Sequence, residues 1–272
     1  MSMGFIGAGT MTGAIVRGII ASGYAKAGEI VAYDPSVTVL DALAAETGIV
    51  PLAGNPEVIA QASTVVLAVK PQVIPRVMEE TAAQLVASRP LVVSIAAGTP
   101  IAALERWLSP AVPIVRVMPN VNVQVRQGMA AVTGNGAASR EHIASVLAMF
   151  DSVGAAIELD ESLVRPFMAI AGSSPAWTFL YIDALARGAV AAGMPKALAL
   201  TVAAKAVGGS AALVAESQAH PWELIDQVSS PAGTTIAGLS VLEDRGLPSA
   251  VTQAVAATIR RDEVIADDGT AS

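Results

Sequence analysis

The sequence of 272 residues contains no cysteine and only two histidines, His142 and His220. The absence of cysteine excludes disulfides, thiol nucleophiles and cysteine-ligated metals. The histidines form no i, i+4 pair and join no carboxylate cluster, so we expect no metal site. A serine nucleophile is equally unsupported, because the Gly172 to Pro175 segment lacks the nucleophile-elbow pattern. Hydride chemistry remains, in which a bound cofactor carries out the difficult step.

Positive charge is also scarce in this chain. The net charge is −7, and the only four lysines are Lys26, Lys70, Lys196 and Lys205. No basic patch is evident, which argues against nucleic acid as a partner. The chain begins directly in a strand-like sequence rather than in a signal peptide, which favours a cytoplasmic protein.

Long uninterrupted apolar runs are absent, although 53% of the residues are apolar and 14% are charged. The best candidate for a membrane span runs from Ala197 to Ala215, and Lys205 and the Gly208-Gly209-Ser210 segment interrupt it. Pieces of about ten residues are shorter than the roughly 20 that a membrane helix needs. We therefore expect a buried helix and no membrane, with the surplus apolar surface at a subunit interface.

Two kinds of pattern divide the chain. Residues 1–160 alternate short apolar runs with helix-like stretches, which predicts an α/β domain with a doubly wound parallel sheet. The apolar runs are Met3 to Ile6, Ile30 to Tyr33, Val65 to Val69, Leu91 to Ile95, Ile114 to Val117, Met129 to Val132 and Ala156 to Leu159. Residues 161–272 lack such runs and carry helical periodicity, so we expect an all-helical second domain. Breaks between its helices are expected at Gly193-Met194-Pro195, at His220-Pro221 and around Ser230 to Gly233.

A glycine-rich turn follows the first predicted strand and opens a helix. Its residues are Gly7, Ala8, Gly9, Thr10 and Met11. Gly7 permits the tight turn, and Gly9 lets the backbone approach a pyrophosphate, as in dinucleotide-binding proteins. The third fingerprint position is Thr12 rather than the usual glycine or alanine. The alternative is a glycine turn that binds no ligand.

The end of the second predicted strand bears on the choice of cofactor. Asp34 can accept hydrogen bonds from both ribose hydroxyls of NAD and would repel a 2′-phosphate. Ser36 and Thr38 offer the alternative of donating to that phosphate if Asp34 turns aside. NADH and NADPH therefore both remain open, with NADH slightly favoured by electrostatics.

Three further strand ends are expected to line the nicotinamide crevice, because ligands bind at the carboxyl ends of parallel strands. Their residues include Val69, Lys70, Pro71, Ala97, Gly98 and Asn120. Proline and glycine also end strands for purely structural reasons, so each of these matches by itself permits a plain turn.

A hydroxyl-rich turn from Ser229 to Thr235 precedes an apolar-periodic stretch. Such a turn is typical of a helix start whose N–H groups bind a carboxylate. No lysine or arginine lies in this segment, so a small carboxylate fits better than a polyphosphate. A well-capped helix without a ligand is the simpler alternative.

Together these motifs resemble those of the pyrroline-5-carboxylate reductase family along nearly the whole chain. The similar segments are Phe5 to Met11, Ala68 to Gln72, Ser94 to Gly98, Arg116 to Asn120, Gly172 to Ala176 and Ser229 to Leu239. The resemblance implies reduction of 1-pyrroline-5-carboxylate to L-proline with NADPH or NADH. It also implies a Rossmann-type domain followed by an all-α dimerisation domain, which forms a homodimer and often a decamer.

The resemblance also implies roles for individual residues. Ser230, Gly233 and Thr234 would bind the carboxylate of the cyclic imine, and the Thr235 hydroxyl would contact the ring nitrogen. Ser174 and Pro175 would join the residues named above in binding the cofactor. The chain departs from the family pattern at Ala232, Val121, Asn122 and Ile225.

Two other functions fit parts of the sequence. A β-hydroxyacid dehydrogenase needs a catalytic lysine with an asparagine one turn later, and no asparagine follows Lys205 at that spacing. A nucleotide-binding sensor without catalysis would keep Gly7 and Gly9 but would not need Thr235. Turnover of reduced nicotinamide with pyrroline-5-carboxylate separates these alternatives.

Overall fold

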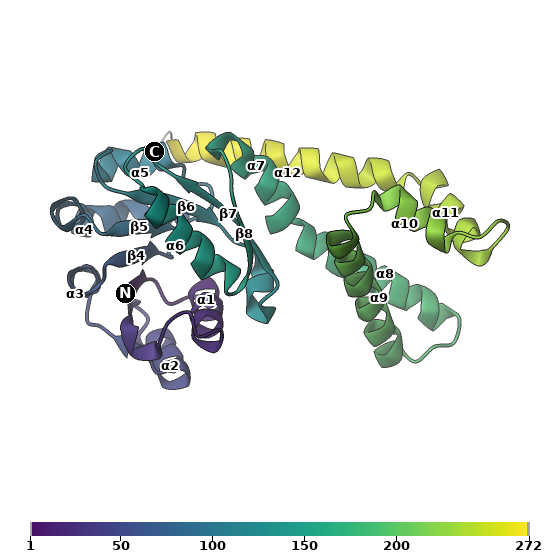
Figure 1. Ribbon diagram of the computed structural model, residues 1–272, viewed down its shortest axis with the longest axis horizontal. Coiled ribbons are helices and arrows are strands. Elements are labelled where there is room, and N and C mark those ends of the chain that lie inside the picture. The colour runs from purple at the N-terminus through teal and green to yellow at the C-terminus, as the bar shows by residue number, and fades with distance from the viewer. Residues whose placement is uncertain (1, 271–272) are drawn as a thin grey trace. The chain divides into compact units, whose positions relative to one another are not determined.

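The computed structural model describes the backbone of residues 2–270 and the side chains of residues 2–264. Contacts between Cα atoms divide the chain into two compact units, one of residues 1–172 with 259–272 and one of residues 173–258. The sequence-based boundary at residue 160 marks a change in element type, because the described residues after Glu158 contain helices and no strand. Figure 1 shows the elements of both units.

The first unit contains one eight-stranded sheet in the order β3-β2-β1-β4-β5-β6-β7-β8. The strands are β1 (Met3–Ile6), β2 (Ile30–Tyr33), β3 (Val50–Pro51), β4 (Thr64–Leu67), β5 (Leu91–Ser94), β6 (Ile114–Met118), β7 (Gly128–Gly134) and β8 (Gly154–Glu158). The first six strands have the order of a Rossmann fold and pair in parallel. The expected α/β doubly wound class is confirmed.

Two features of the sheet differ from the sequence-based expectation. Strand β3, with two exposed residues, was not predicted. Strand β7 pairs antiparallel with β6, whereas a parallel sheet was expected. The connection between them is residues 119–127, shorter than the dozen or more residues that a parallel crossover needs. Strand β8 then pairs parallel with β7 through a helical crossover.

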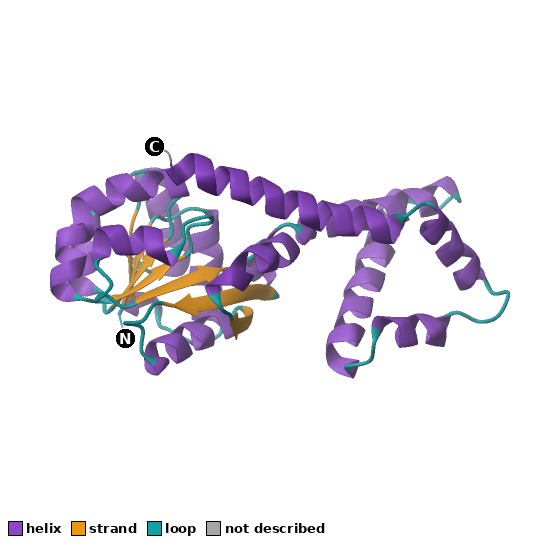
Figure 2. Ribbon diagram, turned by 90° about the horizontal axis from the view of Figure 1, so that it is seen from above, coloured by secondary structure: helices purple, strands orange, loops and turns teal. Residues whose placement is uncertain are grey.

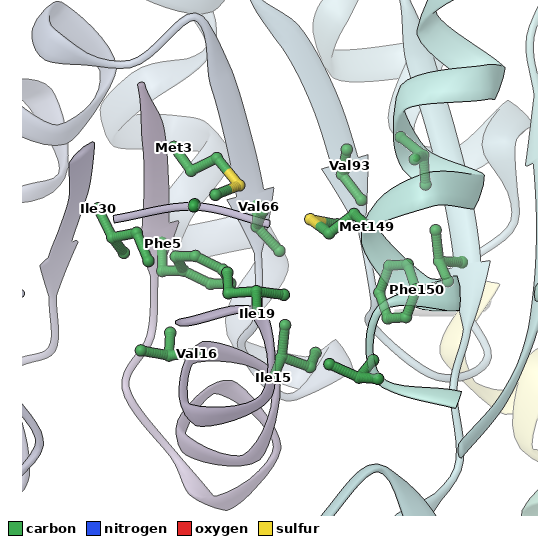
Figure 3. Close-up of a cluster of buried hydrophobic side chains, with 14 of the residues drawn as sticks. Met3, Phe5, Ile15, Val16, Ile19, Ile30, Val66, Val93, Met149 and Phe150 are labelled. Carbon is green, nitrogen blue, oxygen red and sulfur yellow. The ribbon is translucent and has the colours of Figure 1, made fainter. Parts of the chain in front are cut away.

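Helices cover both faces of this sheet (Figure 2). Neighbouring residues of the central strands point to opposite faces, so Val65 packs in one apolar cluster and Val66 in the other. One face receives α1 (Thr10–Ala21), α2 (Val37–Thr47) and α6 (Arg140–Asp151). The other receives α3 (Asn55–Gln61), α4 (Ile74–Ser88) and α5 (Ile101–Leu108). Figure 3 shows Phe5, Ile15 and Phe150 meeting in the first cluster.

Short helices complete the first unit. They are η1 (Ala27–Glu29), η2 (Pro71–Val73), η3 (Val121–Val125), η4 (Glu161–Leu163), α7 (Val164–Phe167) and the π-helix η5 (Met168–Gly172). Arg165 of α7 forms ion pairs with Asp262 and Glu263 at 3.0 and 3.4 Å. These pairs attach the end of the last helix to the first unit.

The second unit is helical throughout, as predicted. Its helices are α8 (Ser174–Ala191), α9 (Lys196–Ser217), α10 (Pro221–Val228), α11 (Thr234–Asp244) and the beginning of α12 (Leu247–Thr270). The predicted breaks near Gly193, Pro221 and Gly233 separate successive helices. The break at Gly246 was not predicted.

The second unit has little core of its own. Its buried apolar cluster consists of Ala186, Ala199 and Ala203. Large apolar side chains on the same helices are exposed, among them Leu180 at 71% and Phe179 at 59%. A core of this size is too small to stabilise helices of this length in water. We therefore expect a further surface to cover the exposed apolar side chains.

Helix α9 corrects one prediction. A buried helix was expected here, whereas only Ala199 and Ala203 of its 22 residues are buried, and the helix continues through Gly208 and Gly209. A helical glycine costs only about 1 kcal/mol, which the neighbouring residues of α9 outweigh. By length and composition alone this helix is apolar enough to cross a membrane.

Candidate functional site

The carboxyl ends of the parallel strands bring the predicted cofactor residues together. The register pairs Ile6 with both Tyr33 and Leu67, and Leu67 with Ser94. The loops that follow these strands therefore emerge at one edge of the sheet. They contain Gly7, Ala8, Gly9, Asp34, Ser36, Val69, Lys70, Pro71, Ala97 and Gly98, with Thr10 and Met11 at the start of α1 and Asn120 after β6.

The backbone at Gly7 requires glycine. Its φ is +101°, and a Cβ atom there would lie 2.7 Å from the Ala68 carbonyl oxygen and 3.0 Å from Val69 Cγ1. Its N–H donates to the Tyr33 carbonyl oxygen at 2.8 Å. Gly7 therefore lies where β1, β2 and β4 meet, and β1 and β4 flank the point at which the sheet reverses its strand order.

The start of α1 fits a pyrophosphate. Gly9 is the N-cap residue, with no side-chain capping bond and no acidic residue in the first turn. A Cβ atom built on Gly9 meets no heavy atom within 4 Å, so its surroundings are open. The first backbone bond of the helix runs from Gly13 N–H to the Gly9 carbonyl oxygen at 2.9 Å. The N–H groups of residues 10–12 precede this bond and suit an anion.

The contacts of Thr12 explain how a threonine is accommodated at the third fingerprint position. Its side chain is buried, with 1% of its surface exposed, and its hydroxyl donates to the Gly7 carbonyl oxygen at 2.8 Å. The extra polar atom is thus satisfied within the turn that it follows. This contact was not predicted from the sequence. The only sign of it was a hydroxyl residue at a position usually held by glycine or alanine.

Asp34 links two loops at this edge. Its Oδ2 accepts a hydrogen bond from the Ala8 N–H at 2.8 Å, and its Oδ1 accepts one from the Ser36 N–H at 2.8 Å. The carboxylate is partly buried. Its position beside the glycine-rich turn agrees with the expected place of the ribose, while the bonds to backbone N–H groups were not predicted.

Asn120 is engaged in holding the fold together. It is 6% exposed, its Nδ2 donates to the Ala171 carbonyl oxygen at 3.0 Å, and its Oδ1 accepts from the Asn122 and Met129 N–H groups. The side chain thereby joins the end of β6 to β7 and to η5. A direct contact between Asn120 and the cofactor remains a prediction.

A groove of about 730 Å³ runs beside the glycine-rich turn. Residues of α1, α2 and η3 line it, including Gly9, Thr10, Thr38 and Arg126. Arg17 and Glu46 also line it and form a two-bond ion pair at 2.6 and 2.8 Å. The hydrogen bond to Arg17 lowers the pKa of Glu46, and the bond to Glu46 raises the pKa of Arg17.

The hydroxyl-rich turn predicted to bind a carboxylate has a glycine at the helix start. Helix α11 has Gly233 as its N-cap residue with no side-chain capping bond, whereas a serine or threonine cap was expected. The Gly233 N–H donates to the Ser230 carbonyl oxygen at 3.0 Å and so closes the turn. Thr234 and Thr235 are the first two residues of the helix, and both are exposed. Their N–H groups and hydroxyls are therefore accessible.

Two features of this turn carry a conformational or polar cost. Ala232 has a φ of +56°, in the left-handed region. The hydroxyl oxygen of Ser229 is buried and has no hydrogen-bond partner among the described residues.

Ser174 and Pro175 begin α8 in the same unit, with Pro175 buried. Within the described residues, no three His, Asp or Glu side chains are grouped to hold a metal ion.

Comparison with known proteins establishes the family. The family model described as pyrroline-5-carboxylate reductase dimerisation matches residues 161–265, and that described as NADP oxidoreductase coenzyme F420-dependent matches residues 2–98. The pyrroline-5-carboxylate reductase of Escherichia coli (strain K12) is 41% identical over 96% of this chain and 97% of its own length. This chain belongs to the pyrroline-5-carboxylate reductase family. It is accordingly an oxidoreductase, and the resemblance seen in its motifs is confirmed.

Solved structures of pyrroline-5-carboxylate reductases agree over the whole chain. The enzyme of Coxiella burnetii is 32% identical, with a TM-score of 0.90 over 96% of this chain and 97% of that one. The enzyme of Plasmodium falciparum, solved with NADP bound, is 28% identical, with a TM-score of 0.88 over 98% of each chain. This chain thus has the domain order of the reductase family, in which a Rossmann-type domain precedes a helical dimerisation domain.

Proposed function

We propose that this chain reduces 1-pyrroline-5-carboxylate to L-proline, the final step of proline biosynthesis, with NADPH or NADH as the hydride donor. The supporting observation is the match to a pyrroline-5-carboxylate reductase along 96% of the chain. The two family models, over residues 2–98 and 161–265, include the glycine-rich turn and the turn before α11. No observation favours a dehydrogenase that uses Lys205 or a sensor without catalysis.

The cofactor would lie at the carboxyl edge of the sheet. The N–H groups at the start of α1 suit its pyrophosphate, because Gly9 leaves the approach open and the helix dipole favours negative charge. The loops containing Val69 to Pro71 and Ala97 to Gly98 would border the nicotinamide. When bound, the reduced nicotinamide supplies the hydride for the C=N bond.

The carboxylate of the imine would bind at the start of α11. The backbone N–H groups there lack a side-chain cap, and Ser230, Gly233 and Thr234 would hold the carboxylate through N–H and hydroxyl groups. The Thr235 hydroxyl would contact the ring nitrogen. The nitrogen must carry a proton for the adjacent carbon to accept a hydride. Solvent can supply that proton before binding, so no strong acid is needed in the site.

Replacement of Thr235 tests this assignment. We expect Thr235→Ala to lower kcat/KM for the imine by about one to two orders of magnitude, as for loss of a hydrogen bond to a charged group. Ser240→Ala is the matched control, because it removes another exposed hydroxyl of α11, one that bonds to the Ile236 carbonyl oxygen. Equal kinetics for the two variants would remove Thr235 from the site. Absence of nicotinamide oxidation by the unmodified chain would remove the proposed activity.

We also propose that the active form is a cytoplasmic homodimer built through the helical domain, which can assemble further into a decamer. The three-alanine core of the second unit and its exposed Leu180 and Phe179 support a second copy as the missing cover. A second copy would also cover the exposed apolar side chains of α9, which lies entirely within the residues matched by the dimerisation family model. Light scattering on detergent-free protein tests this proposal, and a monomer or a detergent requirement would contradict it.

A further inference from the structure

We infer that Asp34 makes this enzyme select NADH over NADPH. The inference rests on the proposed reductase function and concerns the half of the cofactor that does not react. NADP is bound in the Plasmodium falciparum relative, so the fold itself does not exclude a 2′-phosphate. Side chains at the end of β2 lie where the adenosine ribose is expected, so they can distinguish the two cofactors.

The carboxylate of Asp34 is fixed in position. It accepts hydrogen bonds from the N–H groups of Ala8 and Ser36, both at 2.8 Å, and these come from two different loops. Turning the side chain away would break both bonds and leave two backbone donors without this partner. The alternative in which Asp34 moves aside for a phosphate is thus disfavoured.

The same carboxylate retains the capacity to bind a ribose. Each carboxylate oxygen has two lone pairs and accepts one backbone bond, so each has one lone pair left. The 2′- and 3′-hydroxyls of NADH are donors that match these two acceptors. A 2′-phosphate offers acceptors and negative charge at the same place, so it loses the bond and gains repulsion.

Positive charge to offset that repulsion is absent from this part of the sequence. No lysine or arginine occurs between Lys26 and Lys70, a stretch that includes β2, α2 and α3. Arg17, on α1, is already paired through two bonds with Glu46. Arg126 follows η3 and lines the groove beside the glycine-rich turn, so it is the remaining cation among the described residues of that groove. The segment that follows β2 therefore offers the adenosine ribose one carboxylate and no cation of its own.

Binding measured without the imine tests the inference apart from catalysis. By calorimetry, we expect the unmodified protein to bind NADH about 10 to 100 times more tightly than NADPH, which corresponds to roughly 1.4 to 2.8 kcal/mol. The ratio of kcat/KM values for the two cofactors should lie in the same range. Equal affinities or tighter NADPH binding in the unmodified protein would overturn the inference.

Asp34→Asn separates selection from loop positioning. Asparagine keeps an oxygen that can accept from the Ala8 N–H but removes the charge. We expect NADPH to bind about tenfold more tightly to this variant than to the unmodified protein, and NADH to bind no better. Asp41→Asn is the control, since it removes an exposed carboxylate from the neighbouring α2 and should leave the cofactor ratio unchanged.

Each result has a distinct meaning. If Asp34→Asn weakens both cofactors by the same factor, Asp34 only positions the glycine-rich turn, and the inference is wrong. If both cofactors bind but neither is oxidised by the imine, the proposed reductase function fails while selection by Asp34 stands on the binding ratio. The measurement on the unmodified protein decides the inference even if the variant does not fold.

Discussion

Substitution of Ala232 by glycine should stabilise this protein. The residue has a φ of +56°, and left-handed backbone costs a residue with a Cβ atom roughly 1–2 kcal/mol. Glycine removes that cost but adds about 0.4–1 kcal/mol through the greater freedom of the unfolded chain. The net expectation for Ala232→Gly is a stabilisation of about 0.5–1 kcal/mol. For a chain of this size that raises Tm by roughly 1–4 °C.

Ala237→Gly is the matched control for this prediction. Ala237 is also exposed, but it lies inside α11, where an alanine-to-glycine change costs about 1 kcal/mol. The two variants have the same composition and should shift Tm in opposite directions. Thermal scans at one protomer concentration measure this, because association contributes to apparent stability. If Ala232→Gly lowers Tm as much as Ala237→Gly does, the left-handed conformation carries no cost and the reasoning is refuted.

Two further predictions concern the first unit. Gly7→Ala places a Cβ atom 2.7 Å from the Ala68 carbonyl oxygen and should weaken NADH and NADPH binding by at least about tenfold, as measured by calorimetry. Unchanged affinity for both would contradict the fit of the turn to a dinucleotide. Tyr24 donates to the Ser145 carbonyl oxygen at 2.9 Å, and burial raises the pKa of its phenol above 10.0. Its contribution to stability is complete below the unfolded pKa and is lost as pH rises through the folded value. Tyr24→Phe should therefore flatten the alkaline fall of unfolding free energy in urea titrations, and an unchanged slope would count against this assignment.

The parallel part of the sheet was predictable because burial on both faces leaves a plain signal. Short runs such as Val65 to Leu67 are apolar at every position, and turn residues bound them. Once those runs are parallel strands, their carboxyl ends must share an edge. The loops predicted to bind the cofactor must then emerge at that edge. The register of the strands confirms the position of these loops.

Other features could not be derived from residue patterns. Strand β3 is two residues long and includes Pro51, so neither length nor propensity indicates it. Helix α9 is apolar by composition, and composition alone does not tell whether such a helix is covered within one chain or by a further surface. A serine or threonine was expected as the N-cap of α11, whereas the turn closed between Gly233 and Ser230 makes Gly233 the N-cap and the helix begins at Thr234.

The conformational cost of the turn before α11 falls where we propose that the substrate carboxylate binds. A left-handed Ala232, a buried Ser229 hydroxyl with no hydrogen-bond partner among the described residues and a helix start without a side-chain cap lie within a few residues of one another. Buried polar groups are ordinarily hydrogen-bonded, and unsatisfied ones together with backbone outliers concentrate at sites that bind something else. A side-chain cap on α11 would stabilise the helix and would occupy N–H groups that the proposed carboxylate site uses. The uncapped start of α11 lowers local stability and leaves those groups free, which supports the proposed site.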